Sequence, residues 1–129
     1  KYIPDYIGSF AVCIVKNAIH AAVIFTSSIG SSCAGDSRFF AARYGGDEFI
    51  CLCVNTEKEE IESYLKRVYE DLRLAHIEHA TSPAASLATL SIGYSLFDND
   101  EGFDLETAIT MADTALYQAK NSGRNRHSC

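Results

Sequence analysis

The sequence predicts an α+β domain, with a mixed, mainly antiparallel central sheet and helices flanking it. Two apolar runs, 39–42 and 49–54, enclose a Gly-Gly pair. They indicate a β-hairpin, because glycine accepts the positive φ angles of tight hairpin turns. An alternating apolar pattern at 87–97 indicates a further strand. Apolar residues recur at helical spacing in three other segments, which predicts helices packed on the sheet.

The composition fits one domain spanning residues 1–129. A chain of 129 residues with 47% hydrophobic residues can bury a sizeable core. The net charge of −6 argues against nucleic acid as a partner. Segment 9–25 is the nearest approach to a membrane span, but Lys16, Asn17 and His20 interrupt it. We therefore expect no membrane segment within this chain.

The cysteines favour a reducing setting. The count of five is odd, and Cys51 and Cys53 alternate on one predicted strand, so both face the same side. We expect packed thiols rather than a bridge, and a cytoplasmic location. Cys-x-Cys with no second pair at ligand spacing is weak evidence for zinc.

Segment 9–29 is the ambiguous element. Its first seven residues are almost wholly apolar and would suit a buried strand. The run is too long for one strand, however, and Ser9 is an acceptable helix N-cap. We therefore predict a helix, on the helical spacing of Val12, Val15, Ile19, Ala22 and Val23.

A second helix is expected after the hairpin. Thr56 and Glu59 have the spacing of a capping box, in which each side chain bonds the other residue's backbone. The helix then runs through Ile61, Leu65, Val68, Leu72 and Ala75.

The strand predicted at 87–97 contains a glycine and is followed by an acidic loop. Gly93 indicates a bulge or a close backbone contact. Asp98, Asp100 and Asp104 loosely suggest calcium, but EF-hand spacing is absent and a solvated loop is the better interpretation. One face of the strand carries Leu90, Ile92, Tyr94 and Leu96.

The hairpin carries the main candidate site. Gly45 and Gly46 are followed directly by Asp47 and Glu48, at the mouth of the second strand. Adjacent carboxylates beside a bare backbone suit Mg²⁺ and an approaching phosphate group. The alternative is an ordinary turn with a solvated strand end.

A C-terminal helix carries the second candidate group. Gly123 stands where a C-cap is expected, so Lys120 and Arg124 cluster at the helix end. Two cations there can grip phosphates, or they can simply offset the helix dipole. The helix is predicted over residues 105–120 from Leu105, Ala108, Ile109, Ala112, Leu116 and Ala119.

Both segments resemble the signatures of the GGDEF family, the diguanylate cyclases. The run Arg-Tyr-Gly-Gly-Asp-Glu-Phe at 43–49 contains the five name-giving residues without substitution, and the run at 111–125 is similar to the family's C-terminal signature. Residues 89–93 also resemble the strand before the last helix. The resemblance implies the palm-like fold of nucleotide cyclases and polymerases.

The resemblance also implies a reaction and roles for individual residues. Family members condense two GTP molecules to cyclic di-GMP and pyrophosphate, with Mg²⁺ as cofactor. Asp47 would bind metal and help deprotonate the attacking hydroxyl, and Glu48 would support the metal site. Gly45 and Gly46 would let the nucleotide approach the backbone. Phosphate groups would be held by Lys1, Lys120 and Arg124.

The N-terminus matches the family unevenly. Residues 1–9 fit the family's Lys-x-Ile-Asn-Asp-x-x-Gly-His piece at four positions, Lys1, Ile3, Asp5 and Gly8. Ser9 stands for the His. Pro4 and Cys13 stand where the family has the Asn and Asp that read guanine, and neither can make the same hydrogen bonds. We expect the family's first strand, with its metal-binding Asp, upstream of this chain.

Three function classes remain open. The intact hairpin motif with Lys120 and Arg124 favours an active cyclase, acting as a homodimer because each domain binds one GTP. Pro4, Ser9 and Cys13 favour a catalytically inactive module that binds a nucleotide or a partner. A structural dimerisation unit would not need these charged residues together. The resemblance further implies an upstream sensory domain. No Arg-x-x-Asp product-inhibition site is expected, because Cys33 precedes Asp36 at that spacing.

Overall fold

The computed structural model describes residues 9–16, 19–32, 39–45, 48–77, 89–98 and 104–129. The predicted α+β class is confirmed, since this part of the chain forms a five-stranded mixed sheet and three helices. In chain order the elements are β1 (Ser9–Lys16), α1 (Ile19–Ser32), β2 (Phe39–Gly45), β3 (Glu48–Val54), α2 (Lys58–Ala75), β4 (Ile92–Asp98), α3 (Leu105–Asn121) and β5 (His127–Ser128).

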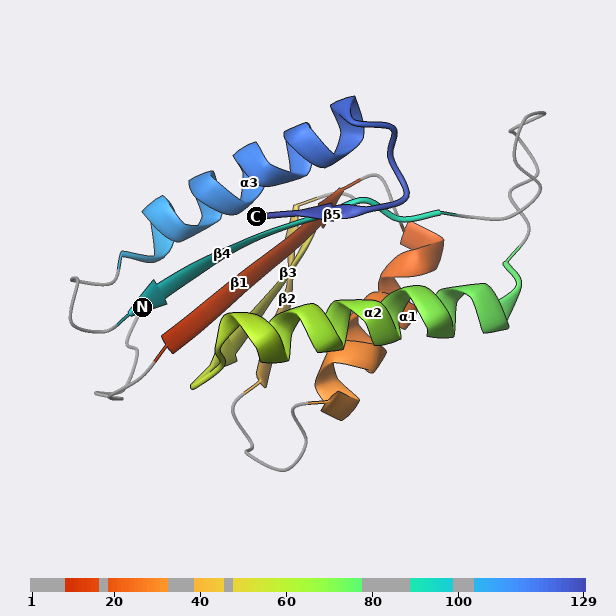
Figure 1. Cartoon of the computed structure of the whole chain (residues 1–129), viewed down its shortest axis with the longest axis horizontal. Coiled ribbons are helices and arrows are strands. Elements are labelled where there is room, and N and C mark those ends of the chain that lie inside the picture. The colour runs from red at the N-terminus through yellow and green to blue at the C-terminus, as the bar shows by residue number, and fades with distance from the viewer. Residues whose placement is uncertain (1–8, 17–18, 33–38, 46–47, 78–88, 99–103) are drawn as a thin grey trace.

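The sheet has the strand order β2-β3-β1-β4-β5 (Figure 1). Strand β1 lies at its centre and pairs antiparallel with both β3 and β4. Strands β2 and β3 form the predicted antiparallel hairpin. Up to β4, the order and the helix connections are those of a β-α-β-β-α-β unit. Helix α3 and β5, which pairs parallel with β4, are added to it.

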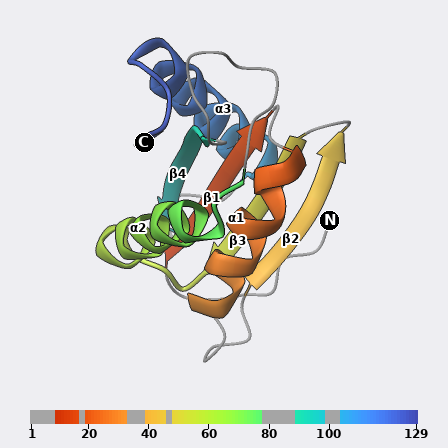
Figure 2. The ribbon, with the colours of Figure 1, turned by 90° about the vertical axis from the view of Figure 1, so that its right-hand side faces the viewer.

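The helices cover both faces of the sheet. Helices α1 and α2 lie together on one face, and α3 lies on the other (Figure 2). Each face therefore has its own buried cluster, and β1 contributes alternate residues to the two. This arrangement explains why β1 is apolar on both sides.

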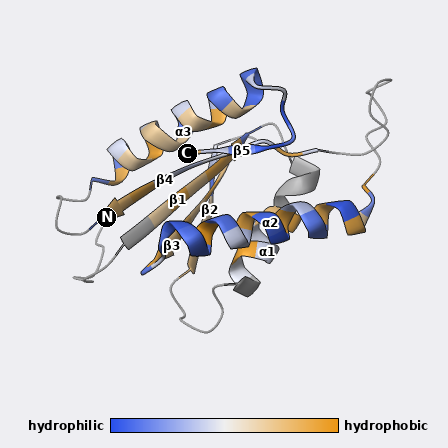
Figure 3. Ribbon diagram, viewed as in Figure 1, coloured by the Kyte–Doolittle hydropathy of each residue, from blue (hydrophilic) through white to orange (hydrophobic). Residues whose placement is uncertain are grey.

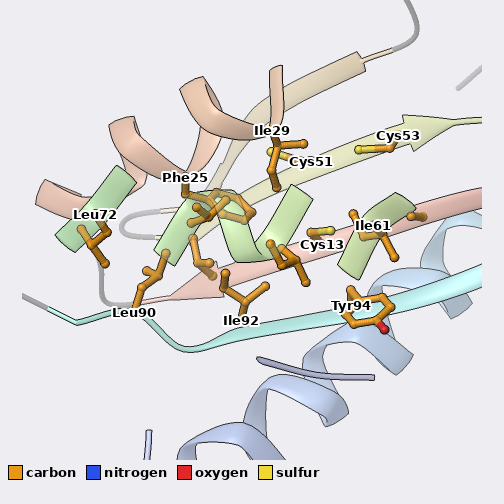
Figure 4. Close-up of a cluster of buried hydrophobic side chains, with 14 residues drawn as sticks. Cys13, Phe25, Ile29, Cys51, Cys53, Ile61, Leu72, Leu90, Ile92 and Tyr94 are labelled. Carbon is orange, nitrogen blue, oxygen red and sulfur yellow. The ribbon is translucent and has the colours of Figure 1, made fainter. Parts of the chain in front are cut away.

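The larger cluster lies under α1 and α2 (Figure 4). It contains Phe25 and Ile29 of α1, and the predicted apolar face of α2 at Ile61, Leu65, Val68 and Leu72. Cys13, Cys51 and Cys53 are buried in it as thiols, outside any disulfide. The expectation of packed thiols is thus confirmed for Cys51 and Cys53.

The smaller cluster joins α3 to the opposite face. Val12, Ile14 and Ile50 pack there against Ala108, Ala112 and Leu116. The small side chains of α3 bring its backbone close to β4, where Gly93 lies opposite. A Cβ placed at Gly93 would lie 2.1 Å from the Ala112 carbonyl oxygen and 2.3 Å from the Leu116 nitrogen. The predicted close backbone contact at Gly93 is therefore confirmed.

The predicted helix at 9–29 is wrong in its first half. Residues 9–16 form β1, and the helix begins only at Ile19. Five consecutive residues from Ala11 to Val15 are at most 1% exposed. A strand buried on both faces has a continuous apolar sequence, which periodicity alone does not distinguish from a buried helix.

Two helix starts show local capping. Helix α2 begins one residue later than predicted, because Glu57 and Glu60 form the capping box and the Glu57 N–H donates to Glu60 Oε1 at 3.2 Å. The Thr56 hydroxyl instead donates to the Val54 carbonyl. Asp104 caps α3 by accepting from the Thr107 N–H. Figure 3 shows the mixed hydrophobic and hydrophilic faces of α2.

Strand β4 is shorter than the predicted 87–97, since it begins at Ile92. The predicted inward face is nevertheless confirmed: Leu90, Ile92 and Tyr94 are buried in the larger cluster, and Leu96 packs against it.

No helix in the described ranges combines the length and apolar character required to cross a bilayer.

Strand β5 is attached to α2 by a polar cluster. Glu62 Oε1 lies 2.7 Å from His127 Nε2, and the Tyr94 hydroxyl donates to Glu62 Oε2. Burial raises the pKa of Glu62, but the hydrogen bonds from Tyr94 and His127 outweigh it and hold the pKa below its ordinary value. The His127 ring also stacks on Tyr69, with 5.8 Å between the ring centroids.

Candidate functional site

The hairpin places Glu48 at one edge of the sheet. Strand β2 ends at Gly45 and β3 begins at Glu48, with an irregularity in the pairing between Arg43 and Gly45. In the β1–β3 register, Glu48 is opposite Lys16, the last residue of β1. The end of the central strand and the start of its neighbour therefore meet at the tip of the hairpin.

Alternation along the strands decides which face these side chains occupy. Val12 and Ile14 pack against α3, and Lys16 follows at the same period of two. Ile50 also packs on this face, and Glu48 precedes it by two residues. Lys16 and Glu48 thus both lie on the α3 face.

An ion-pair cluster joins three elements at this edge. Lys16 Nζ lies 3.2 Å from Glu48 Oε1 on β3 and 2.8 Å from Asp113 Oδ1 on α3. The side chains are 31% exposed for Lys16, 30% for Glu48 and 47% for Asp113. The ammonium group therefore bridges two carboxylates that are far apart in the sequence.

The charges in the cluster support one another. The pKa of Lys16 is raised, chiefly by its hydrogen bond to Asp113; partial burial opposes this rise, and the bond to Glu48 adds to it. Lys16 is consequently a cation at neutral pH. Because the group is partly exposed, solvent screens each pair, and each contributes of the order of 1 kcal/mol or less.

The C-terminal end of α3 carries the two predicted phosphate-binding cations. Lys120 is seven residues beyond Asp113, which places it on the same helix face about 10 Å along the axis. The helix ends at the cap residue Ser122, and Gly123 follows with φ +125°. The predicted helix stop at Gly123 is confirmed, because this φ favours glycine.

Arg124 lies just beyond the helix end. It is exposed, has φ 63°, and its backbone N–H donates to the Ala119 carbonyl at 3.1 Å. This backbone hydrogen bond holds the turn after the helix, and the Arg124 side chain is exposed to solvent. Lys120 is half-buried and engaged in an interaction of its own.

The structure describes four of the seven predicted site residues. Gly45 and Glu48 lie at the hairpin, and Lys120 and Arg124 at the end of α3. Predictions on the other positions lie outside the described residues: Lys1, Gly46 and Asp47 of the site, Pro4 and Asp5 of the N-terminal match, and Cys33 and Asp36 of the product-inhibition spacing.

The structure places Cys13 in the interior of the sheet. It was aligned with a guanine-reading residue, but it is fully buried in the middle of β1, opposite Cys51 and Tyr94. A thiol in this position cannot reach a nucleotide. The sheet centre is filled by β1 from within the chain, and the expected further strand upstream stays a prediction.

The described residues include one member of the expected Mg²⁺ ligand pair, Glu48. Among them, no three His, Cys, Asp or Glu side chains are grouped so as to hold a metal ion. Glu48, the described member of the expected ligand pair, has its carboxylate oxygen on the Lys16 ammonium group. A positive charge bonded to the ligand oxygen opposes a divalent cation there.

Two members of the ion-pair cluster were missed from the sequence. Lys16 falls inside the helix predicted at 9–29, and Asp113 falls in the 111–125 signature without a predicted role. The alternation of Val12, Ile14 and Lys16 would have found the first, had the strand been recognised. Asp113 is joined to Lys16 by an ion pair, whereas Tyr117 is 67% exposed.

Proteins with similar sequences have more than one activity. Diguanylate cyclase A of Treponema denticola is 37% identical over 89 residues, which cover 67% of this chain and 22% of that protein. The cyclic di-GMP phosphodiesterase PdeR of Escherichia coli strain K12 is 38% identical over 89 residues, covering 66% of this chain and 12% of that protein. The matched part of this chain therefore spans about a fifth or less of these relatives.

Solved structures share the fold. The GGDEF domain of DgcB from Caulobacter crescentus, solved in complex with c-di-GMP, superposes with a TM-score of 0.68 at 22% identity, covering 93% of this chain and 77% of that one. The active GGEEF domain of a diguanylate cyclase from Vibrio cholerae gives a TM-score of 0.65 at 21% identity, with 94% and 82% covered. The family model described as "Diguanylate cyclase, GGDEF domain" matches residues 22–126. The chain therefore belongs to the GGDEF domain family.

Proposed function

We propose that this domain binds GTP at the sheet edge formed by the β2–β3 hairpin and the end of α3, and that two such domains condense two GTP molecules to cyclic di-GMP. The observation that carries the proposal is the meeting of Glu48 and Asp113 at the Lys16 ammonium group, on the α3 face of the sheet and beside the Gly-Gly-Asp-Glu-Phe run. The family and its cyclase relatives support the same reaction.

In this proposal the 3′-hydroxyl of each GTP attacks the α-phosphate of the other. The new phosphodiester bond forms as the bond to the β-phosphate breaks, and pyrophosphate leaves. The hydroxyl proton is accepted at Asp47. Lys1, Lys120 and Arg124 bind phosphate oxygens and stabilise the charge that develops on them. Gly45 and Gly46 keep the turn free of side chains, so that the nucleotide can lie against the backbone.

The assembly belongs to the proposal as well. Since each domain would supply one GTP, the active unit is a homodimer. The relatives are several times longer than their matched region, which supports a protein with an upstream sensory domain. We place it in the cytoplasm, where GTP is available. The described residues form no complete ligand set for the divalent ion that is expected with GTP, so no step is assigned to this ion.

The test is incubation of the purified protein with GTP and Mg²⁺, followed by chromatography for cyclic di-GMP. The expected result is product that disappears in Asp47→Ala and is retained in Glu59→Ala, a matched control on the exposed start of α2. Absence of product from the wild-type protein, under conditions where it is folded and dimeric, would contradict the cyclase.

A second candidate is a domain that binds a nucleotide or partner without turnover. The ion pair between Lys16 and Glu48 favours it, because it engages a carboxylate that the expected cyclase site would use. Equilibrium binding of a non-hydrolysable GTP analogue separates the candidates. If the analogue binds but GTP yields no cyclic di-GMP, the domain is the regulatory module. If the analogue binds and GTP yields cyclic di-GMP, the domain is the cyclase.

A further inference from the structure

We propose that the Lys16 ammonium group occupies the position of a bound cation at this site. It takes the place of a divalent ion between Glu48 and Asp113, so that a metal ion can bind Glu48 only after this ammonium group leaves. The inference deepens the proposed function and rests on it for the role of Glu48. It accounts for the ion pair that Glu48, an expected metal ligand, makes with a cation of the same chain.

The position of Lys16 is set by the sheet. Lys16 and Glu48 are cross-strand partners on the central strand β1 and its neighbour β3. Directly opposed side chains on one face have Cβ atoms about 5 Å apart, which brings opposite charges within bonding reach. The pairing therefore follows from the register and does not depend on a mobile surface loop.

The third member of the cluster, Asp113, gives the ammonium group a second carboxylate partner. Asp113 approaches the same nitrogen from α3, at 2.8 Å. The two carboxylates and one ammonium group leave a formal charge of −1, against −2 for the carboxylates alone. An entering divalent ion would meet the ammonium charge at contact distance, and this repulsion opposes its binding. Lysine has a flexible stem, so its head group can be displaced without unfolding β1.

The first test measures Mn²⁺ binding without nucleotide, from the electron paramagnetic resonance signal of the free ion. Lys16→Met removes the charge and keeps an unbranched stem, and Lys66→Met on the exposed side of α2 is the matched control. We expect Mn²⁺ to bind Lys16→Met about ten-fold more tightly than the wild type. Lys66→Met should match the wild type. Equal affinity in all three proteins would overturn the inference.

The second test includes a measurement in the wild-type background, which does not depend on the folding of Lys16→Met. In the wild type, Glu48→Gln should change Mn²⁺ affinity by less than about two-fold, because the carboxylate is already bound by Lys16. In the Lys16→Met background, Glu48→Gln and Asp113→Asn should each abolish the gain. A wild-type protein that loses Mn²⁺ affinity about ten-fold on Glu48→Gln would show that Glu48 already holds the ion, and would refute the inference.

These measurements are separate from the test of the proposed function. Mn²⁺ binding is followed without GTP, so failure to form cyclic di-GMP leaves its outcome unaffected. Conversely, product formation by a wild-type protein with Glu48-dependent metal binding would uphold the cyclase and reject the role of Lys16.

Discussion

Substituting Gly93 by alanine tests the close packing of α3 on the sheet. The new Cβ would lie 2.1 Å from the Ala112 carbonyl oxygen and 2.3 Å from the Leu116 nitrogen. Both atoms are backbone, so no side-chain rotation relieves the contact, and α3 must move by about 1 Å to restore an ordinary distance. We expect a loss of about 3 kcal/mol in the free energy of unfolding.

This loss is measurable as a shift of the melting temperature. With an unfolding entropy of about 2.1 cal/mol/K per residue over 129 residues, 3 kcal/mol lowers Tm by about 10 °C. Calorimetry or circular dichroism would measure the shift, and urea unfolding would give the free energy independently. Because α3 carries Asp113, the shift of this helix should also weaken the ion pair with Lys16.

Gly30→Ala is the matched control for this substitution. There the new Cβ would meet the Phe39 ring at 3.1 Å, but a side chain can yield, and alanine favours the helix by about 0.5–1 kcal/mol. We expect its free energy of unfolding to stay within about 1 kcal/mol of the wild type. If Gly93→Ala were equally mild, the reasoning that α3 and β4 meet through backbone atoms would be refuted.

Three further predictions concern stability. Leu65→Ala removes a fully buried side chain from the larger cluster, and should cost about 2–5 kcal/mol in urea unfolding. Ser95→Ala removes the 2.8 Å hydrogen bond to the Ala108 carbonyl, and should cost about 1 kcal/mol, whereas exposed Ser63→Ala should be neutral. The pKa of Glu62 is lower in the folded state than in the unfolded chain. The resulting stability is present above the pKa of the unfolded state, and it is lost as pH falls through the pKa of the folded state. Between pH 7 and pH 3, Glu62→Gln should therefore show a smaller decline of unfolding free energy than the wild type; an equal decline would contradict the assignment.

The hairpin and the last two helices could be predicted from the sequence because local rules define them. The Gly-Gly pair forces the chain to turn between two apolar runs, and the pairing of β2 with β3 follows. The helical spacing of Ile61, Leu65, Val68 and Leu72 gives a single buried face in α2. Gly123 ends α3 through its positive φ. These signals lie within a few residues of the structure that they describe.

The central strand could not be predicted in the same way. Segment 9–29 is apolar throughout its first part, and the two faces of β1 are both covered, one by α1 and α2 and the other by α3. Because both faces of β1 are covered, its polar and apolar residues show neither the period of two of a strand nor the period of 3.6 of a helix. Only pairing with β3 and β4 identifies 9–16 as a strand, and that pairing joins residues about forty and eighty positions apart.

The sequence by itself determined the family, the hairpin motif and the cations at the end of α3, because each is written in contiguous residues. Only the tertiary structure decided what the motif touches. Lys16, Glu48 and Asp113 come from three elements, and the strand register together with the packing of α3 brings their charged atoms within 3.2 Å and 2.8 Å. Side chains that meet across a sheet and a helix have no fixed spacing in the sequence, so their encounter is a property of the fold.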